Sequence, residues 1–139
     1  MHLTSYLNFD GKCEEAFKFY EKALNGKITA LVTFDSMGPG HVPEGWGHKL
    51  MHAQMTVGGQ ELMGSDAPPD RFERQQGFSM SVHVDQPAEA ERVFAALAEN
   101  GTVRMPIQKT AWAEKFGMLT DRFGIPWMVN CAAASTANA

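Results

Sequence analysis

The chain repeats one structural pattern twice, and the repeat is clearest in two helical stretches. Apolar residues recur at i, i+3, i+4 and i+7 in both stretches, a spacing that places them on one face of an α-helix. They are Ala16, Phe19, Tyr20 and Ala23 in the first stretch and Ala90, Val93, Phe94 and Leu97 in the second. The two stripes are 74 residues apart, so the chain is predicted to contain two copies of one unit.

Each helical stretch ends at an Asn-Gly pair, Asn25-Gly26 in the first and Asn100-Gly101 in the second. Helices commonly end at a residue in the left-handed conformation, which glycine adopts without steric cost. We therefore expect Gly26 and Gly101 to take the left-handed position. Two matched helix ends support the repeat.

Strands are predicted around each helical stretch. Apolar alternation predicts one strand before each helix, at residues 3–9 and 78–84. Three strands follow each helix, at 28–34, 52–57 and 60–65 in the first half and at 102–109, 116–119 and 125–131 in the second. Both halves therefore have the order βαβββ, and the predicted fold class is α+β.

The two copies are predicted to form one domain, residues 1–131. Its parts are a βαβββ unit at 1–66, a linker at 67–75 that contains Pro68-Pro69, and a second unit at 76–131. Glycines and prolines between residues 36 and 47 predict a loop, for which a lid is the favoured role. The small and polar residues 132–139 predict a flexible tail.

Composition excludes several classes of function. The formal net charge is −4 and the 12 Lys and Arg are scattered along 139 residues, so no basic stripe is available for nucleic acid. Cys13 and Cys131 lack the spacing of a disulfide framework or a thiolate zinc site, which favours a reducing cytoplasm. Residues 1–6 lack the basic and apolar segments typical of a signal peptide, and no apolar run in the sequence is long enough to span a bilayer. We therefore expect a cytoplasmic protein with no membrane partner.

Several motifs, spread over about 130 residues, resemble one known family. They are Phe9-Asp10-Gly11-Lys12-Cys13-Glu14-Glu15-Ala16, Phe19-Tyr20, Leu62-Met63-Gly64-Ser65-Asp66, Trp112 with Phe116-Gly117, and Thr120-Asp121-Arg122-Phe123-Gly124-Ile125-Pro126-Trp127. In this order they resemble the PhnB-like branch of the vicinal oxygen chelate superfamily, which includes glyoxalases, bleomycin-resistance proteins and dioxygenases. The resemblance implies curved mixed sheets that enclose a cavity between the two copies, and it implies a homodimer.

Catalytic members of that superfamily bind a divalent metal through four inward side chains. The resemblance places those positions at Thr4 (or Ser5), Met63, Ser79 and Met128. Hydroxyls and thioethers are poor ligands for such an ion. We therefore expect no shared metal site and no cofactor. Relatives of this branch carry a demethylubiquinone methyltransferase label, but nothing in the chain resembles a glycine-rich nucleotide site, so methyl transfer is not predicted.

Strand alternation identifies the side chains expected to line the cavity. They are Tyr6, Asn8, His52, Met63, Ser65, Ser79, Ser81, His83, Trp112 and Met128. His52 and His83 are also candidates for a general acid or base. The competing interpretation is that each is a half-buried strand residue with a satisfied hydrogen bond. Cys13 lies at a helix start beside Glu14 and Glu15, so an ordinary thiol is expected.

Three functional hypotheses follow from these residues. In the first, the chain binds a small, partly apolar molecule in a metal-free cavity. In the second, it is a lyase, isomerase or hydrolase that uses His52 or His83 as a base, alone or with a recruited divalent metal. In the third, it is a structural dimer with a filled interior.

Overall fold

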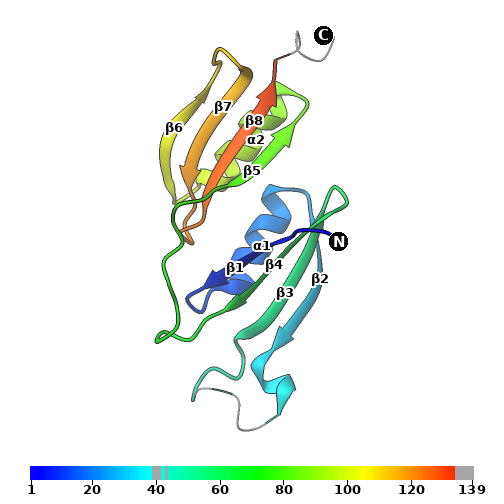
Figure 1. The fold of residues 1–139 in the computed structure, drawn as a ribbon, viewed down its shortest axis with the longest axis vertical. Coiled ribbons are helices and arrows are strands. Elements are labelled where there is room, and N and C mark those ends of the chain that lie inside the picture. The colour runs from blue at the N-terminus through cyan, green and yellow to red at the C-terminus, as the bar shows by residue number, and fades with distance from the viewer. Residues whose placement is uncertain (39–41, 43, 134–139) are drawn as a thin grey trace. The chain divides into compact units, whose positions relative to one another are not determined.

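The computed structural model describes residues 1–38, 42 and 44–133 (Figure 1). The chain divides into two compact units, Met1–Glu73 and Arg74–Ala139. Part of the loop predicted at 36–47, and the tail from residue 134 onward, lie outside the described residues. Ala132, predicted to begin the tail, is instead the last residue of a strand.

Unit 1 consists of four strands, one α-helix and one short 3₁₀ helix. In chain order these are β1 (Ser5–Phe9), α1 (Cys13–Ala23), β2 (Lys27–Thr33), η1 (Phe34–Met37), β3 (Leu50–Val57) and β4 (Gln60–Asp66). The sheet has the order β1-β4-β3-β2, in which β1 is parallel to β4 and the other neighbours are antiparallel.

Unit 2 repeats this arrangement. Its elements are β5 (Met80–Val84), α2 (Pro87–Ala98), β6 (Thr102–Gln108), β7 (Ala113–Thr120) and β8 (Pro126–Ala132). The order β5-β8-β7-β6 matches that of unit 1, again with the outer pair β5 and β8 parallel. The predicted α+β class and the tandem βαβββ order are therefore confirmed.

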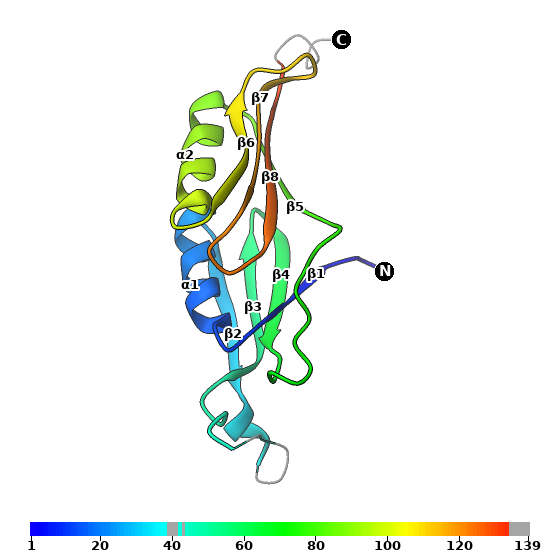
Figure 2. The ribbon, with the colours of Figure 1, turned by 90° about the vertical axis from the view of Figure 1, so that its left-hand side faces the viewer.

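The helix of each unit packs on one face of its own sheet (Figure 2). On α2 the buried residues are those of the predicted stripe, Ala90, Val93, Phe94 and Leu97. On α1 the prediction needs correction, because Phe17 is buried and Phe19 is only half-buried. The Phe17 ring contacts those of Phe9 and Tyr20, with centroids 6.2 Å away in both cases.

Two glycines show which sheet face each helix covers. A Cβ atom on Gly64 would lie 2.9 Å from Phe17 of α1, and one on Gly117 would lie 2.6 Å from Phe94 of α2. Both glycines therefore face their helix and permit its close approach. Because successive side chains of a strand point to opposite faces, the neighbours Met63, Ser65, Phe116 and Met118 point away from it.

The helix ends differ from the prediction for Gly26 and Gly101. The residues in the left-handed conformation are Asn25, with φ 53°, and Asn100, with φ 58°. The glycines are instead needed for space, since a Cβ atom would lie 2.8 Å from the Thr56 carbonyl oxygen at Gly26 and 2.5 Å from that of Thr120 at Gly101. Asparagine tolerates the left-handed region better than most residues, so the two residues divide the roles.

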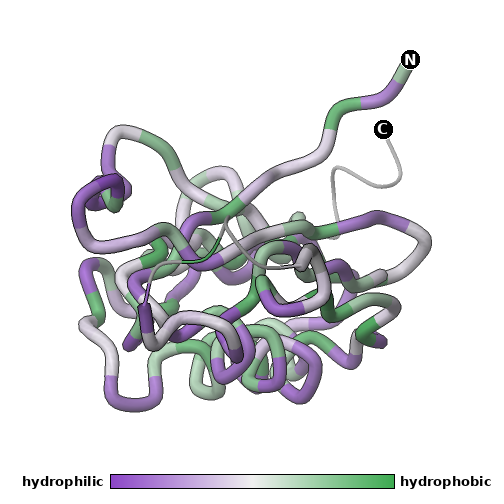
Figure 3. Tube along the Cα trace, turned by 90° about the horizontal axis from the view of Figure 1, so that it is seen from below, coloured by the Kyte–Doolittle hydropathy of each residue, from purple (hydrophilic) through white to green (hydrophobic). Residues whose placement is uncertain are grey.

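Strand boundaries shift by a few residues from the predicted ones. Phe34 begins η1 rather than ending a strand, β7 begins at Ala113 rather than Phe116, and Phe78 and Ser79 precede β5. Hydrophobic and hydrophilic residues succeed each other at short intervals along the trace (Figure 3). None of the described helices has both the length and the apolar character that a membrane crossing requires.

Candidate functional site

The open face of the unit 1 sheet, opposite α1, carries a group of polar side chains. Pairing between the strands aligns Tyr6 of β1 with Met63 of β4, and Met63 with Gln54 of β3. Asn8 lies beside Ser65 in the same way. We call this set the unit 1 face: Tyr6, Asn8, His52, Gln54, Met63 and Ser65.

His52 is the centre of the hydrogen bonds on this face. Its Nδ1 lies 3.1 Å from the Tyr6 hydroxyl and its Nε2 lies 3.3 Å from Gln54 Oε1. Because an amide oxygen can only accept, Nε2 carries a proton, whereas Nδ1 can accept from the Tyr6 hydroxyl or donate to it. Both ring nitrogens of His52 therefore have a hydrogen-bond partner, and its ring centroid is 5.8 Å from that of Tyr6.

Asn8 and Ser65 extend the unit 1 face along β1 and β4. The Ser65 hydroxyl donates to Asn8 Oδ1 over 3.4 Å, a longer contact than those of His52. Tyr6 is 46% exposed and Ser65 is half-buried. The unit 1 face therefore offers hydroxyl, amide and imidazole groups beside the thioether of Met63.

The unit 2 sheet has an equivalent open face. Pairing aligns Ser81 of β5 with Met128 of β8, and His83 with Asn130. Phe116 and Met118 of β7 pair with Asn130 and Met128 in turn. We call this set the unit 2 face: Ser81, His83, Phe116, Met118, Met128 and Asn130.

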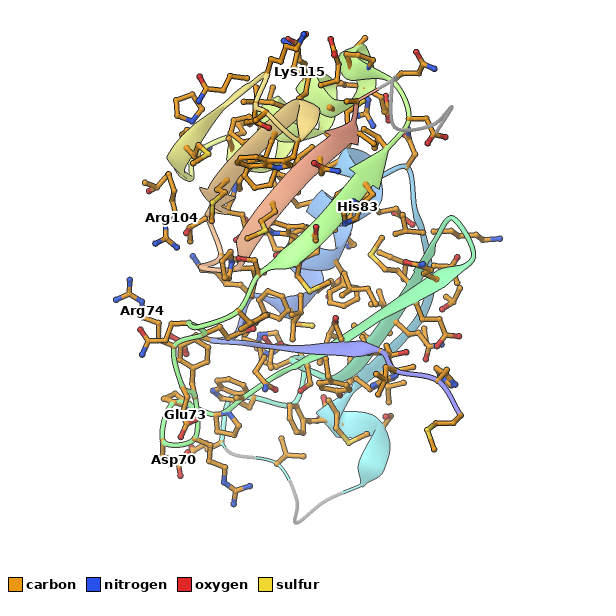
Figure 4. All side chains as sticks on the ribbon, turned by 45° about the horizontal axis from the view of Figure 1, so that its top comes forward. Asp70, Glu73, Arg74, His83, Arg104 and Lys115 are labelled. Atoms are coloured by element: carbon orange, nitrogen blue, oxygen red, sulfur yellow. The ribbon has the colours of Figure 1, made fainter. Side chains whose placement is uncertain are left out.

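His83 on β5 (Figure 4) is held in the same way as His52. Its Nδ1 lies 3.4 Å from Asn130 Nδ2 and its Nε2 lies 2.9 Å from the Ser81 hydroxyl oxygen. Because an amide nitrogen can only donate, Nδ1 accepts and Nε2 carries the proton that is donated to Ser81. In both histidines Nε2 carries a proton, and the hydrogen-bond partners are uncharged side chains.

Two residues of the predicted set lie outside these faces. Trp112 precedes β7, is 61% exposed, and its ring centroid is 5.6 Å from that of Phe116. Ser79 precedes β5 and is half-buried. Thr4 precedes β1 in the same way. The structure therefore groups Tyr6, Asn8, His52, Met63 and Ser65 on one unit and Ser81, His83 and Met128 on the other.

Sequence reasoning missed Gln54 and Asn130, which complete the hydrogen bonding of the two histidines. Gln54 lies two residues after His52 on β3, so strand alternation places it on the same face. Asn130 lies two residues after Met128 on β8 by the same rule. The spacing of two residues could have identified both amides, but amides are less typical of catalytic or binding sites than histidines.

Asp66 has a structural role. It is 3% exposed, and its two carboxylate oxygens accept hydrogen bonds from the backbone N–H groups of Cys13 at 2.8 Å and Leu50 at 2.9 Å. It thereby joins the end of β4 to the starts of α1 and β3. Burial, followed by the charges of Asp66 and Glu14, raises the pKa of the Cys13 thiol, so Cys13 is a poor nucleophile.

Comparison with known proteins is consistent over almost the whole chain. Residues 1–130 match the model of the family described as 3-demethylubiquinone-9 3-methyltransferase. The chain belongs to this family. It is 34% identical over 139 residues to protein YjdN of Escherichia coli K12, and the alignment covers 94% of this chain and 95% of YjdN.

Solved structures agree with this family and its PhnB-like character. Protein PA1353 from Pseudomonas aeruginosa is 47% identical, with a TM-score of 0.86 over 95% of this chain and 98% of that one. A putative 3-demethylubiquinone-9 3-methyltransferase, PhnB protein, from Bacillus cereus is 31% identical, with a TM-score of 0.80 over 95% of this chain and all of that one. The predicted PhnB-like resemblance is therefore confirmed.

A more distant likeness concerns the fold alone. The fosfomycin resistance protein FosX from Mesorhizobium loti is 10% identical, with a TM-score of 0.62 over 100% of this chain and 97% of that one. This chain therefore shares its fold with vicinal oxygen chelate proteins.

The donor atoms that this family member offers do not fit the divalent metal of catalytic vicinal oxygen chelate proteins. The positions that the resemblance assigns to the metal carry the hydroxyls of Thr4 and Ser79 and the thioethers of Met63 and Met128, which are poor ligands for a hard or borderline ion. Across the described parts of the chain, no group of three or more His, Cys, Asp or Glu side chains is arranged to hold a metal. We derive no chemical step through such an ion.

Proposed function

We propose that this PhnB-like protein binds a small, partly apolar molecule on its open sheet faces without using a metal ion. The observation that carries the proposal is the hydrogen bonding of the two histidines. On each face an imidazole is held by uncharged neighbours, Tyr6 and Gln54 around His52, and Ser81 and Asn130 around His83. A ligand can form hydrogen bonds with these side chains, or its polar atoms can replace some of the hydrogen bonds between them.

The methionines supply the apolar part of the proposed site. Met63 is next to Tyr6 and Gln54 in the sheet, and Met118 and Met128 are paired on β7 and β8. All three are half-buried. Flexible thioether side chains adapt to ligands of different shape and contact aromatic rings favourably. A ligand with an apolar body and a few hydrogen-bonding groups suits this mixture.

The histidine contacts favour ligand binding over base catalysis and over metal recruitment. A general base or a metal ligand needs an imidazole nitrogen with an available lone pair. In both histidines each ring nitrogen already lies within hydrogen-bond distance of a side chain, Tyr6 and Gln54 for His52, and Asn130 and Ser81 for His83. Methyl transfer, the reaction named in the family description, and simple sequestration both require a bound small molecule. We propose binding only.

The proposal is tested by a fragment screen on protein labelled with ¹³C in its methionine methyl groups. The chain has nine methionines, so fragments that bind the faces are expected to move the signals of Met63, Met118 or Met128. For a fragment that hydrogen-bonds an imidazole, His52→Ala or His83→Ala is expected to weaken binding by about threefold to tenfold. Met128→Asp, which adds a charge to the unit 2 face, should also weaken binding.

A matched control is His48→Ala, because His48 is exposed in the segment before β3 and belongs to neither face. This variant is expected to bind the same fragments with unchanged affinity. Fragments that move only other methionine signals, or affinities that stay the same in His52→Ala and His83→Ala, would contradict the proposal.

A further inference from the structure

Unit 2 contains a pocket of about 590 Å³ at one end of its sheet. Pockets of this size hold small organic molecules. Its walls come from the segment that precedes β5, from the start of β6 and from the turn between β7 and β8. They include Arg74, Gln75, Phe78, Thr102, Arg104 and Thr120.

A bulge in β6 helps to direct Arg104 to this pocket. Val103 pairs with Leu119 of β7 and Met105 pairs with Met118, so two steps along β6 correspond to one step along β7. Arg104 is the extra residue. An extra residue in a strand leaves the regular alternation and re-aims its side chain. Figure 4 shows Arg74 and Arg104 extending on the same side of unit 2.

The two arginines have no ion-pair partner among the described residues. Within the described residues, neither Arg74 nor Arg104 takes part in the ion pairs, which involve Lys18, Arg92, Lys115 and Arg122. None of the described residues that line the pocket is acidic. Two guanidinium groups on one pocket, without a carboxylate partner, form a site of net charge +2.

We infer that this pocket binds a small organic phosphate, with its dianionic group between Arg74 and Arg104. A phosphate dianion balances both charges, and guanidinium groups bind its oxygens through paired hydrogen bonds. The hydroxyls of Thr102 and Thr120, whose residues pair across β6 and β7, offer further donors. Phe78, which is 44% exposed, offers a ring on which an apolar or aromatic body can pack.

This inference is independent of the proposed function, because none of its residues belongs to the unit 1 face or the unit 2 face. On β8, Pro126 at the pocket is two residues from Met128 of the unit 2 face, so the pocket adjoins that face but is lined by other residues. Its ligand can therefore be tested without knowing the ligand of the faces.

The test is a titration of ¹⁵N-labelled protein with phenyl phosphate, followed by NMR. Saturable shifts are expected for backbone amides in 74–78, 102–104 and 120–126. Arg74→Ala and Arg104→Ala are each expected to weaken binding by about tenfold, the cost of one charged hydrogen-bonding group. Arg104→Lys keeps the charge but loses the fork of the guanidinium, so it should bind less tightly than the wild-type protein.

The control variant is Arg92→Ala, which removes an arginine from α2 of the same unit, away from the pocket. Its affinity for phenyl phosphate should equal that of the wild-type protein. Benzoate, a monoanion with the same ring, should bind several-fold more weakly. The inference is overturned if phenyl phosphate causes no saturable shifts in these segments, if benzoate binds equally well, or if both arginine variants keep their affinity while their spectra show a folded protein.

Discussion

At the scale of single residues, Asp66 and Asp121 are the buried acidic side chains of the described part of the chain. Asp121 accepts from the backbone N–H groups of Phe123 and Ile125 and from the indole Nε1 of Trp127, over 2.8 to 3.0 Å. Asp66 accepts from two backbone N–H groups in unit 1. Both residues belong to the motifs that resemble the family, and their contacts show that those motifs serve the fold.

We predict that Asp66→Ala destabilises the protein by about 3 kcal/mol, because it leaves the buried N–H groups of Cys13 and Leu50 without an acceptor. Urea unfolding measures the change. Asp70→Ala, which removes an exposed carboxylate from the segment that follows β4, should change stability by less than about 0.5 kcal/mol. Equal stabilities of the two variants would argue against a structural role for Asp66.

The sequence placed His52 and His83 by alternation on the strand faces that they occupy, where His52 is half-buried and His83 is exposed. It was not sufficient to identify their partners. The contacts of His52 with Tyr6 and of His83 with Asn130 join residues 46 and 47 positions apart. Such pairs depend on the register between strands, which a pattern along one strand does not contain.

At the scale of elements, the helices and strands were predictable in order and type, and their ends were less so. Phe17 and Phe19 are both apolar, and both i+3 and i+4 spacings are compatible with one helix face, so the stripe alone did not show that Phe17 is the buried one. The Asn-Gly pairs were correctly placed at the helix ends. Within each pair, asparagine takes the left-handed conformation and glycine leaves space for a β-strand. The sequence alone did not show this, because the approach of the strand is a tertiary feature.

Substitutions at the two neighbours Asn25 and Gly26 should therefore differ in their effect on stability. Gly26→Ala should destabilise the protein by about 1–3 kcal/mol, because the added Cβ meets the Thr56 carbonyl oxygen at 2.8 Å. Asn25→Gly should cause little loss, because glycine accepts the positive φ of 53° that Asn25 adopts. Thermal unfolding of the two variants decides between the roles. A stable Gly26→Ala protein together with a destabilised Asn25→Gly protein would support the original assignment.

At the scale of the whole molecule, the internal repeat was the most informative property of the sequence. It predicted two βαβββ units, and each unit carries an open face with one histidine held by uncharged side chains. The homodimer and a cavity that uses both units stay predictions, because they depend on contacts beyond a single unit. The cytoplasmic location also stays a prediction. Sedimentation equilibrium would test the first of these.

The central claim, that the protein acts without a metal ion, is tested most directly by the metal content of the purified protein. Plasma mass spectrometry on protein prepared without an affinity tag or a chelator measures it. We predict no stoichiometric divalent metal, because Thr4, Met63, Ser79 and Met128 offer hydroxyls and thioethers, and the ring nitrogens of His52 and His83 already have hydrogen-bond partners. One tightly held divalent ion per chain, lost in a His52→Ala or His83→Ala variant, would contradict the account and favour a metal-dependent enzyme.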